Sequence, residues 1–215
     1  MEDAESVTRG TAMEHIFMNM DVMSIGGFRD NPPDRCYHCK KAIFGRIKEE
    51  AAKYGIEIIL DGTNSDDDND YRPGMKALKE LGVKSPLKEC GLGKSEIREY
   101  SRQLGLGTWD KPSMACLASR IPYNESITLE KLKLVEKAEM YLQQEGFRQF
   151  RVRCHGNIAR IEIAPAEMPK ILDLDIMKSI NDELKAIGFS YVTLDMQGYR
   201  TGSLNETLGK NGMEG

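Results

Sequence analysis

Three cysteines are the residues of this sequence best suited to chemistry. Cys36 and Cys39 form a Cys-x-x-Cys pair, and Cys116 lies far downstream in a loop that contains proline and serine. The pair alone is typical of a zinc site, a redox dithiol, cluster ligands or a chance spacing. Three thiolates are one short of a closed structural zinc site. They suit an iron–sulfur cluster that keeps one iron open for chemistry.

The alternatives to a cluster lack supporting residues. A thioredoxin-like redox motif needs Trp-Cys-Gly-Pro-like flanks after a first strand, and Tyr37-His38 does not supply them. His38 lies between the two cysteines, so it is poorly placed as a fourth zinc ligand. Cys90 and Cys154 are further candidates for that ligand, and we expect both to be incidental. Five cysteines without an export signal indicate metal-binding, catalytic or free thiols rather than a disulfide framework.

Three arginines form a second candidate site. Arg151 and Arg153 lie two residues apart on a predicted strand, so their side chains share one face. With Arg200, they could converge on a phosphate through charge-assisted, two-point hydrogen bonds. From the spacing alone, a solvated arginine face explains the pattern equally well.

Strands and helices in the first half of the chain must position the cysteines. We expect a buried strand at residues 14–20 and a helix, capped by Asp34, that runs from near Cys36 to Gly55. Both cysteines of the pair then lie in the first turn, on one face. The exposed backbone N–H groups and the positive dipole end of that turn favour thiolate over thiol.

A second buried strand is predicted at residues 56–60, because the run is short and β-branched. Asp61 and Asn64 follow it directly. Open α/β sheets bind ligands at the carboxyl ends of their strands, so we expect these two residues to bind a cofactor. The acidic run after them fails the calcium-loop pattern, since Tyr71 stands where glycine is required. We therefore expect most of it to be a solvated loop.

The second half of the chain predicts a small α+β unit. Thr128 is expected to cap a long amphipathic helix that ends at Gly146. Further elements are expected as strands at 150–153 and 158–163, a helix at 175–186 and a strand at 191–194.

Length and composition indicate a globular chain of one or two domains. The chain has 215 residues, of which 40% are hydrophobic and 30% charged. A linker at 121–124 is a plausible boundary. We therefore expect one domain at residues 1–122, a second at residues 123–206 and a disordered tail at residues 207–215.

Charge and hydropathy restrict the partners. The net charge of −4 argues against nucleic-acid binding driven by charge alone. No run approaches the apolar length needed to span a bilayer, and the acidic start has no signal-peptide pattern. We expect a cytoplasmic protein with no membrane or nucleic-acid partner, whose local basic clusters serve a phosphorylated small molecule.

Six motifs, taken in order, resemble one known family. They are Asn-Pro-Pro-Asp-Arg-Cys-Tyr-His-Cys-Lys, Asp-Gly-Thr-Asn-Ser-Asp-Asp, Tyr-Arg-Pro-Gly, Gly-Leu-x-Lys-Ser-Glu-Ile-Arg, Thr-Trp-Asp-Lys-Pro-Ser-x-Ala-Cys-Leu-Ala-Ser-Arg and Gly-Tyr-Arg-Thr-Gly-Ser-Leu-Asn. Together they closely resemble the LarE family of ATP-dependent sulfur transferases, which belong to the PP-loop ATP pyrophosphatases. The resemblance runs from about residue 12 to residue 206.

The resemblance implies a fold and an activity. The fold is an α/β domain of the adenine nucleotide α-hydrolase-like (HUP) type with a parallel sheet, followed by the small α+β domain. The activity converts the carboxylates of pyridinium-3,5-biscarboxylic acid mononucleotide to thiocarboxylates, a step toward the nickel-pincer nucleotide cofactor of lactate racemase. Mg²⁺-ATP adenylates a carboxylate, pyrophosphate leaves, and sulfur attacks the mixed anhydride. Family members resemble trimer-based hexamers, so a homo-oligomer is expected.

The resemblance also implies roles for individual residues. In cluster-bearing members, cysteines matching Cys36, Cys39 and Cys116 hold a [4Fe–4S] cluster whose free iron binds an extra sulfide for transfer. Cys116 also matches the sulfur donor of the sacrificial members. Glu139 matches the family's acidic active-site residue. The implied substrate-binding residues are Arg151, Arg153, Arg200, Ser119 and His38.

One family motif is absent from this sequence. The Ser-Gly-Gly-x-Asp-Ser loop that cradles the ATP phosphates has only a faint echo at Ser24-Ile25-Gly26-Gly27. The α/β domain thus reads as N-terminally truncated: either a truncated gene model or a natural form that has lost autonomous ATP hydrolysis. A tRNA thiolase is one alternative, against which the acidic charge balance counts. A non-catalytic sulfur or metal carrier or a regulatory subunit is another, which the missing loop favours.

Overall fold

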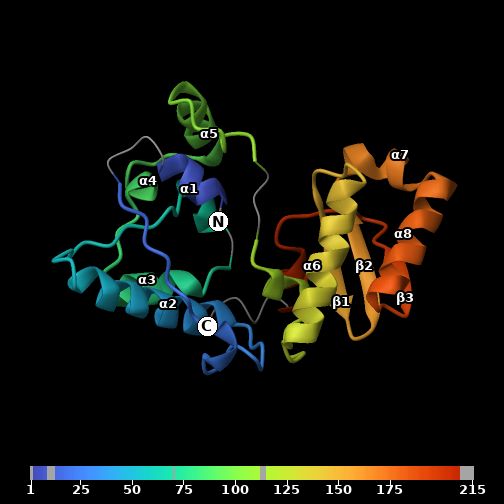
Figure 1. Ribbon diagram of the computed structural model, residues 1–215, viewed down its shortest axis with the longest axis horizontal. Helices are drawn as coiled ribbons and strands as arrows, with labels where there is room; N and C mark the ends of the chain where they lie inside the picture. Colours follow the sequence, from blue (N-terminus) through green and yellow to red (C-terminus); the bar gives the residue numbers. More distant parts are fainter. Residues whose placement is uncertain (1, 9–12, 70, 112–114, 209–215) are drawn as a thin grey trace. The chain divides into compact units, whose positions relative to one another are not determined.

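A computed structural model of the protein describes residues 2–8, 13–69, 71–111 and 115–208 (Figure 1). The chain divides into two compact units. The first comprises Met1–Gly26 and Asp34–Lys111, and the second comprises Gly27–Pro33 and Pro112–Gly215. Cys36 and Cys39 therefore belong to the first unit and Cys116 to the second. Most of the tail predicted at the C-terminus lies outside the described residues.

Helices make up most of the first unit. They are α1 (Glu2–Thr8), α2 (Arg35–Ala52), α3 (Gly74–Glu80), α4 (Pro86–Glu89) and α5 (Lys94–Gln103), with 3₁₀ turns at Val22–Ser24 and Ser65–Asn69. α2 packs against α3, where Tyr37 and Lys41 both donate hydrogen bonds to Glu80 at 2.9 Å. The helix predicted from near Cys36 is confirmed as α2. Within the described residues, no helix is both long and apolar enough to cross a membrane.

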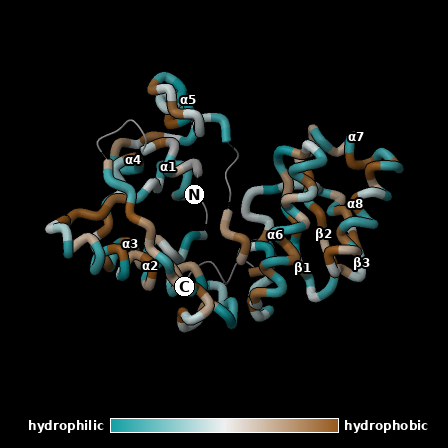
Figure 2. Tube along the Cα trace, in the orientation of Figure 1, coloured by the Kyte–Doolittle hydropathy of each residue, from teal (hydrophilic) through white to brown (hydrophobic). Residues whose placement is uncertain are grey.

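Two segments predicted as buried strands do not pair into a sheet. Residues 14–20 have no regular strand structure, and Phe17 is 55% exposed. Residues 56–60 make one isolated parallel bridge, to Lys84, and Ile58 is 69% exposed; Figure 2 shows this apolar run in brown. A parallel strand is buried only when neighbouring elements cover both of its faces. No element does so in the described part of this unit, so both strand predictions are wrong and the predicted parallel sheet is not confirmed.

The second unit is built on a small mixed sheet. Its elements are α6 (Leu129–Gln144), β1 (Phe150–His155), β2 (Ile158–Ile163), α7 (Met168–Ile171), α8 (Leu174–Ile187) and β3 (Tyr191–Leu194), with 3₁₀ segments at Leu117–Arg120, Pro165–Glu167 and Ser203–Leu208. The strand order is β1-β2-β3, antiparallel between β1 and β2 and parallel between β2 and β3. The helices and strands predicted here are confirmed, with ends that differ by a few residues.

Alternation along β1 separates a core face from a polar face. Val152 and Cys154 are fully buried, whereas Arg151 and Arg153 belong to the other face. Burial raises the pKa of the Cys154 thiol, which keeps it protonated in the core. Helices α6 and α8 complete the core with Val135, Ala138, Leu142, Ile180 and Leu184. The polar face is left to carry the charged residues of the site.

The predicted cap of α6 is confirmed and gives a first test of the fold. The Thr128 hydroxyl accepts a hydrogen bond from the Lys131 backbone N–H at 3.2 Å. We expect Thr128→Ala to lower the free energy of unfolding by about 1 kcal/mol, because it leaves an N–H group of the first turn without its partner. Urea denaturation measures this change. The exposed Thr201 is the matched control, and an equal loss in Thr201→Ala would contradict the cap.

Candidate functional site

The Cys116 loop is held by a hydrogen-bonded turn. Cys116 is exposed, and it precedes the 3₁₀ segment Leu117–Arg120. Its carbonyl oxygen accepts hydrogen bonds from the Ser119 backbone N–H at 2.9 Å and from the Ser119 hydroxyl at 2.7 Å. The main chain therefore holds the turn, and the thiol is exposed at its start. Ser119, predicted to bind substrate, shapes this turn.

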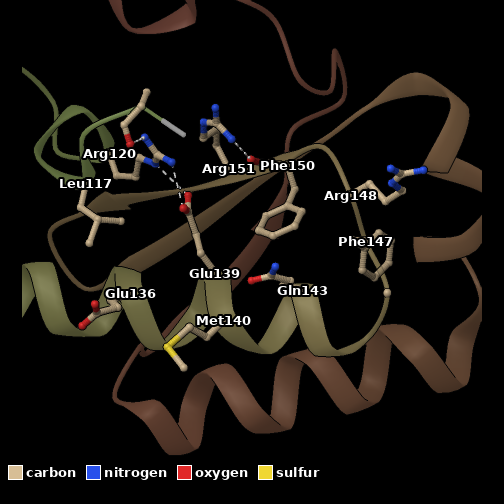
Figure 3. Close-up of a pocket in the computed structure, with 12 residues that line it drawn as sticks. Leu117, Arg120, Glu136, Glu139, Met140, Gln143, Phe147, Arg148, Phe150 and Arg151 are labelled. Atoms are coloured by element: carbon tan, nitrogen blue, oxygen red, sulfur yellow. Dashed lines mark hydrogen bonds and ion pairs between the residues drawn. The ribbon is translucent and has the colours of Figure 1, made fainter. Parts of the chain in front are cut away.

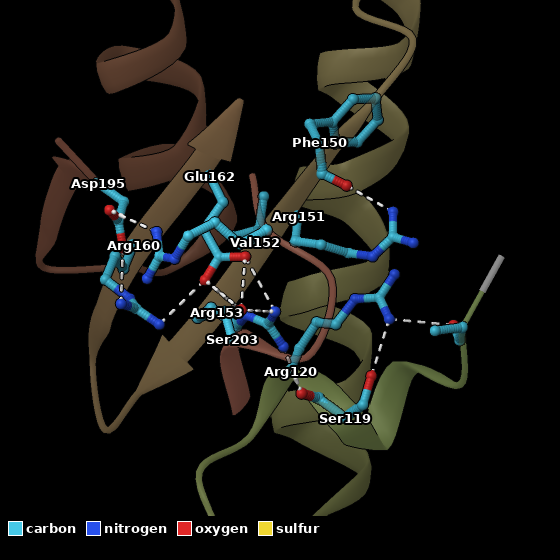
Figure 4. Close-up of polar contacts among 12 residues, drawn as sticks. Ser119, Arg120, Phe150, Arg151, Val152, Arg153, Arg160, Glu162, Asp195 and Ser203 are labelled. Atoms are coloured by element: carbon cyan, nitrogen blue, oxygen red, sulfur yellow. Dashed lines mark hydrogen bonds and ion pairs between the residues drawn. The ribbon is translucent and has the colours of Figure 1, made fainter. Parts of the chain in front are cut away.

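Arg120 donates hydrogen bonds to the same turn (Figure 4). It is 1% exposed, and its Nη1 donates to the carbonyl oxygens of Ala115 and Cys116 at 3.0 and 3.2 Å. Nη1 also lies 2.9 Å from the Ser119 hydroxyl oxygen, as a donor. The guanidinium is a rigid, planar fork of donors, so its orientation fixes the three loop oxygens around it.

Glu139 of α6 holds Arg120 in this orientation. Its carboxylate oxygens accept hydrogen bonds from Arg120 Nε and Nη2 at 2.8 and 2.9 Å, a two-point contact between buried charges. Oε1 also accepts from the Val152 backbone N–H at 3.0 Å, which ties the pair to β1. Glu139 thus orients the residue that grips the Cys116 loop. Its implied part in the chemistry stays a prediction.

Arg153 makes a second contact with the loop. It is 7% exposed, and its Nε and Nη2 donate to the carboxylate of Glu162 at 3.0 and 2.9 Å. Nη1 donates to the Ser119 carbonyl oxygen at 2.8 Å, and Nη2 donates to the Ser203 hydroxyl at 2.6 Å. Most of its donors are therefore committed within the protein, and its implied contact with a substrate phosphate stays a prediction.

Arg200 is also committed to carboxylates. It donates to Glu206 at 2.9 and 3.1 Å and to Asp195 at 3.3 Å. The hydrogen bond with Glu206 is the main reason that the pKa of Arg200 is raised above its ordinary value. Arg200 does not line the cavity described next, and its implied role in substrate binding stays a prediction.

Arg151 lines a cavity of about 400 Å³ beside the loop (Figure 3). Its guanidinium lies 5.1 Å from the ring centre of Tyr199 and donates to the Phe150 carbonyl oxygen at 2.6 Å. Burial, and then the nearby cation of Arg120, lower the pKa of Arg151 from its ordinary value. The volume falls within the range typical of small-molecule sites.

The cavity wall combines charges with apolar groups. Arg120, Arg148 and Arg151 supply positive charge, and Glu136 and Glu139 supply negative charge. The apolar part comes from Leu117, Met140, Phe147 and Phe150. Such a wall suits a flat ring that carries charged substituents. Ala115 and Leu117, the neighbours of Cys116 in sequence, both line it, so a bound ring would lie beside the Cys116 loop.

Cys36 and Cys39 lie at the start of α2 in the first unit. Cys36 is exposed and Cys39 half-buried, and Arg35 Nη2 lies 4.0 Å from Cys36 Sγ. Asp34 precedes the helix as predicted, but its side chain does not cap it. Its carboxylate instead contacts His38 Nε2 at 3.2 Å. His38 thus has a partner in the residue that precedes its helix, and its implied contact with substrate stays a prediction.

Asp61 and Asn64 follow the 56–60 run, as predicted. Asp61 accepts hydrogen bonds from the Ser85 hydroxyl at 2.6 Å and from the Thr63 hydroxyl. Burial acts to raise the pKa of Asp61, but these hydrogen bonds outweigh it and lower the pKa from its ordinary value. Asn64 Oδ1 accepts from the Asp66 backbone N–H at 3.1 Å and so shapes the turn. Their cofactor-binding role stays a prediction.

The acidic run after Asn64 is more ordered than predicted. Asp67 is 8% exposed and pairs with Arg72 at 3.0 Å. Asp66 accepts from the Lys94 backbone N–H at 2.7 Å, at the start of α5. The expectation of a solvated loop is therefore wrong at Asp67, which is buried, whereas Asp66 is exposed and contacts the start of α5.

The three cysteines come from two units, so the cluster stays a prediction. Within residues 2–8, 13–69, 71–111 and 115–208, no three His, Cys, Asp or Glu side chains are arranged to hold a metal ion. Sequence reasoning also missed Arg120 and Arg148. Arg120 had a usable signal, since it lies four residues after Cys116 in the same motif. Arg148 had none, because only the folded chain brings it to the cavity.

The chain is similar to known proteins over most of its length. It is 40% identical to an uncharacterized protein of Synechocystis, over 98% of this chain and 78% of the relative. It is 39% identical to the pyridinium-3,5-bisthiocarboxylic acid mononucleotide synthase of Lactiplantibacillus plantarum, over 89% of this chain and 68% of the relative. It is 34% identical to an uncharacterized protein of Methanocaldococcus jannaschii, over 86% of this chain and 71% of the relative. No family model matches the chain.

Proposed function

Since the chain belongs to the LarE family, represented by the synthase of Lactiplantibacillus plantarum, we propose that it transfers sulfur to a carboxylate of a pyridinium mononucleotide. The acceptor is pyridinium-3,5-biscarboxylic acid mononucleotide, and the product is a thiocarboxylate on the route to the nickel-pincer nucleotide cofactor. One observation carries the proposal. The exposed Cys116 stands on a turn gripped by the buried Arg120–Glu139 pair, beside a cavity of suitable size.

The reaction joins a sulfur nucleophile to an activated carboxylate. In the activated acceptor, AMP is linked to the carboxylate as a mixed anhydride. Sulfide attacks the carbonyl carbon, a C–S bond forms, and the C–O bond to AMP breaks with its electron pair. The acceptor carbon is neither oxidised nor reduced, so sulfur must arrive at the oxidation level of sulfide.

Residues of this chain bring the two reactants together. Ala115 and Leu117 place the ring site next to the Cys116 loop. Arg120 is already neutralised by Glu139, so its contribution is to hold the loop carbonyls and keep the thiol in one position. Arg151 adds positive charge for the anionic groups of the substrate. Holding both reactants in fixed positions lowers the barrier by removing the entropy cost of their encounter.

Cys36, Cys39 and Cys116 together hold a [4Fe–4S] cluster in this proposal. All three are thiols, and Cys36 and Cys39 lie three residues apart on one face of α2. Iron of such a cluster is bound by cysteine as thiolate. When bound, the cluster would supply an iron able to carry sulfide to the acceptor. The donor set fits this group, since three cysteines leave one iron without a protein ligand.

Mg²⁺ and ATP are the proposed source of activation. The lowered pKa of Asp61 keeps its carboxylate ionised, and oxygen ligands of this kind suit Mg²⁺. The Ser-Gly-Gly-x-Asp-Ser motif is not among these 215 residues. The test therefore separates activation of the acceptor from sulfur transfer.

The experiment uses two arms with the anaerobically reconstituted chain. One arm supplies the biscarboxylic acid mononucleotide with Mg²⁺-ATP and sulfide, and pyrophosphate release is measured. The other arm supplies the preformed acyl adenylate and sulfide. In both, mass spectrometry follows the exchange of one carboxylate oxygen for sulfur, against a control without protein.

The two arms have different consequences. Thiocarboxylate from the adenylate above the control supports sulfur transfer, and pyrophosphate release in the other arm supports activation by the same chain. No thiocarboxylate in either arm, with folded protein and a full complement of iron, would overturn the proposed transferase. That result would favour a non-catalytic carrier or regulatory subunit, the second candidate.

A further inference from the structure

Arg98 of α5 holds the segment of the first unit that leads to the Cys116 loop. Its Nη1 donates to the Trp109 carbonyl oxygen at 2.9 Å, and its Nη2 donates to the Lys111 carbonyl oxygen at 2.7 Å. One planar guanidinium therefore fixes two carbonyl groups that lie two residues apart. Lys111 is the last residue of the first unit, and Cys116 follows five residues later.

Residues 107–111 are held on α5 by hydrogen bonds more than by packing. Most of their side chains are exposed, and Trp109 is 42% exposed. The Trp109 N–H donates to the Leu106 carbonyl oxygen at 3.2 Å, a bond within the turn itself. The Leu106 N–H donates to the Ser101 carbonyl oxygen of α5 at 2.9 Å. Residues beyond Leu106 are therefore joined to α5 by the Arg98 side chain.

The place of this contact limits how far Cys116 can lie from α5. An extended chain spans at most about 3.6 Å for each residue, so the five residues after Lys111 reach roughly 18 Å. Without the Arg98 contacts, the next hydrogen bond to α5 in the described chain is that of the Leu106 N–H. The ten residues after Leu106 reach roughly 36 Å. Arg98 thus halves the length of chain between α5 and Cys116.

The connection that leads to Cys36 is fixed at an equivalent place. Asn31 belongs to the second unit and lies five residues before Cys36. It is fully buried, and its Nδ2 donates to the carbonyl oxygens of Ile121 and Pro122 at 3.2 and 2.7 Å. Its φ of 55° is in the left-handed region, which asparagine adopts more readily than most residues. Each connection therefore has a held residue five positions before its cysteine.

We infer that Arg98 is a positioning residue, which holds the chain before Cys116 so that this cysteine meets Cys36 and Cys39. The inference rests on the proposed function and deepens it, because the three thiols of the proposed cluster come from two units. The effective concentration of one group near another falls roughly as the −3/2 power of the length of chain that joins them. Doubling that length therefore lowers the effective concentration of Cys116 at the pair roughly threefold.

The test measures this effective concentration without metal or substrate. The whole chain carries Cys39→Ser, so that Cys36 has no neighbouring thiol with which to form a disulfide. This parent is equilibrated, free of metal, in buffers of reduced and oxidised glutathione. Each disulfide formed between Cys36 and Cys116 converts one oxidised glutathione to two reduced molecules. Mass spectrometry of the digested chain measures the fraction joined, and the glutathione ratio converts it to an effective concentration.

Three variants of this parent are compared. Arg98→Ala is expected to lower the effective concentration roughly threefold, because it removes both contacts. Arg98→Lys is expected to give a value between those of Arg98→Ala and the parent, since one ammonium replaces the two-point fork. Arg102→Ala is the matched control, because Arg102 lies on the same helix and pairs with Glu99 at 2.8 Å. It is expected to keep the parent value.

The outcomes separate the inference from the proposed function. An effective concentration in Arg98→Ala equal to that of the parent, in protein shown by circular dichroism to be folded, would overturn the role of Arg98 and leave the proposed function standing. An equal decrease in Arg102→Ala would also overturn it, because the effect would not depend on the contacts with residues 109 and 111. A parent that forms no disulfide between Cys36 and Cys116 would overturn the inference together with the proposed three-cysteine cluster.

Discussion

Replacing Cys116 with serine is expected to reduce thiocarboxylate formation by roughly a thousandfold or more, because sulfur delivery needs the thiol at this position. Stability is expected to stay within about 0.5 kcal/mol, since Cys116 is exposed and its carbonyl oxygen, not its side chain, holds the loop. The acyl adenylate assay and urea denaturation measure the two effects on the same preparation.

Cys90 supplies the matched control for this substitution. It is an exposed thiol of the first unit that belongs to no proposed site. Cys90→Ser is expected to leave product formation and iron content unchanged. Full product formation by Cys116→Ser would show that the reaction does not need the Cys116 thiol. An equal loss of product formation in Cys90→Ser and Cys116→Ser would show that the effect is not specific to Cys116.

The Arg120–Glu139 pair is expected to have the largest effect on stability. Glu139→Gln leaves the buried Arg120 without its counter-charge, which costs about 3–5 kcal/mol of unfolding free energy. Arg120→Met combined with Glu139→Gln removes both charges and is expected to recover much of that loss, since apolar replacement of a buried pair is often close to neutral. Glutamine keeps an oxygen for the Val152 N–H group.

The double variant separates folding from positioning. It lacks the donors that hold the carbonyl oxygens of Ala115 and Cys116, so it is expected to form little product even where its stability is recovered. Urea denaturation and the adenylate assay are measured side by side. Wild-type product formation by the double variant would contradict the role of Arg120 in positioning the loop. A loss of less than about 1 kcal/mol of unfolding free energy in Glu139→Gln alone would contradict the stabilising role of the buried ion pair.

Local patterns predicted the second unit and helix α2 of the first unit, but they were wrong about the two strands of the first unit. The Thr128 cap, the amphipathic α6 and the alternation along β1 are properties of neighbouring residues, and the structure follows them. Residues 14–20 and 56–60 have the composition of buried strands, but a strand forms only with a partner to pair with. In the described part of the first unit, residues 56–60 make one isolated bridge and residues 14–20 make none, and Ile58 remains exposed.

The site residues show the same contrast between local patterns and contacts with distant parts of the chain. The family resemblance drew attention to Cys116, Ser119 and Glu139. Cys116 and Ser119 share one turn, and Glu139 holds the Arg120 side chain that donates to that turn. The buried contacts of Arg120 and Arg153 depend on carboxylates 19 and 9 residues away in the chain, and their spacing in sequence gives no sign of these partners. Spacing and the family resemblance marked Arg151, Arg153 and Arg200 as candidates, and only the fold distinguishes arginines that hold the loop from those that line the cavity.

The intact mass of the chain after turnover tests most directly whether sulfur is transferred without consuming Cys116. The reconstituted protein is incubated with excess acyl adenylate and sulfide, and both the protein and the product are weighed by mass spectrometry. We expect a chain of unchanged mass and more than one thiocarboxylate for each chain. A chain lighter by one hydrogen sulfide at Cys116, with product formation ending at one for each chain, would contradict it.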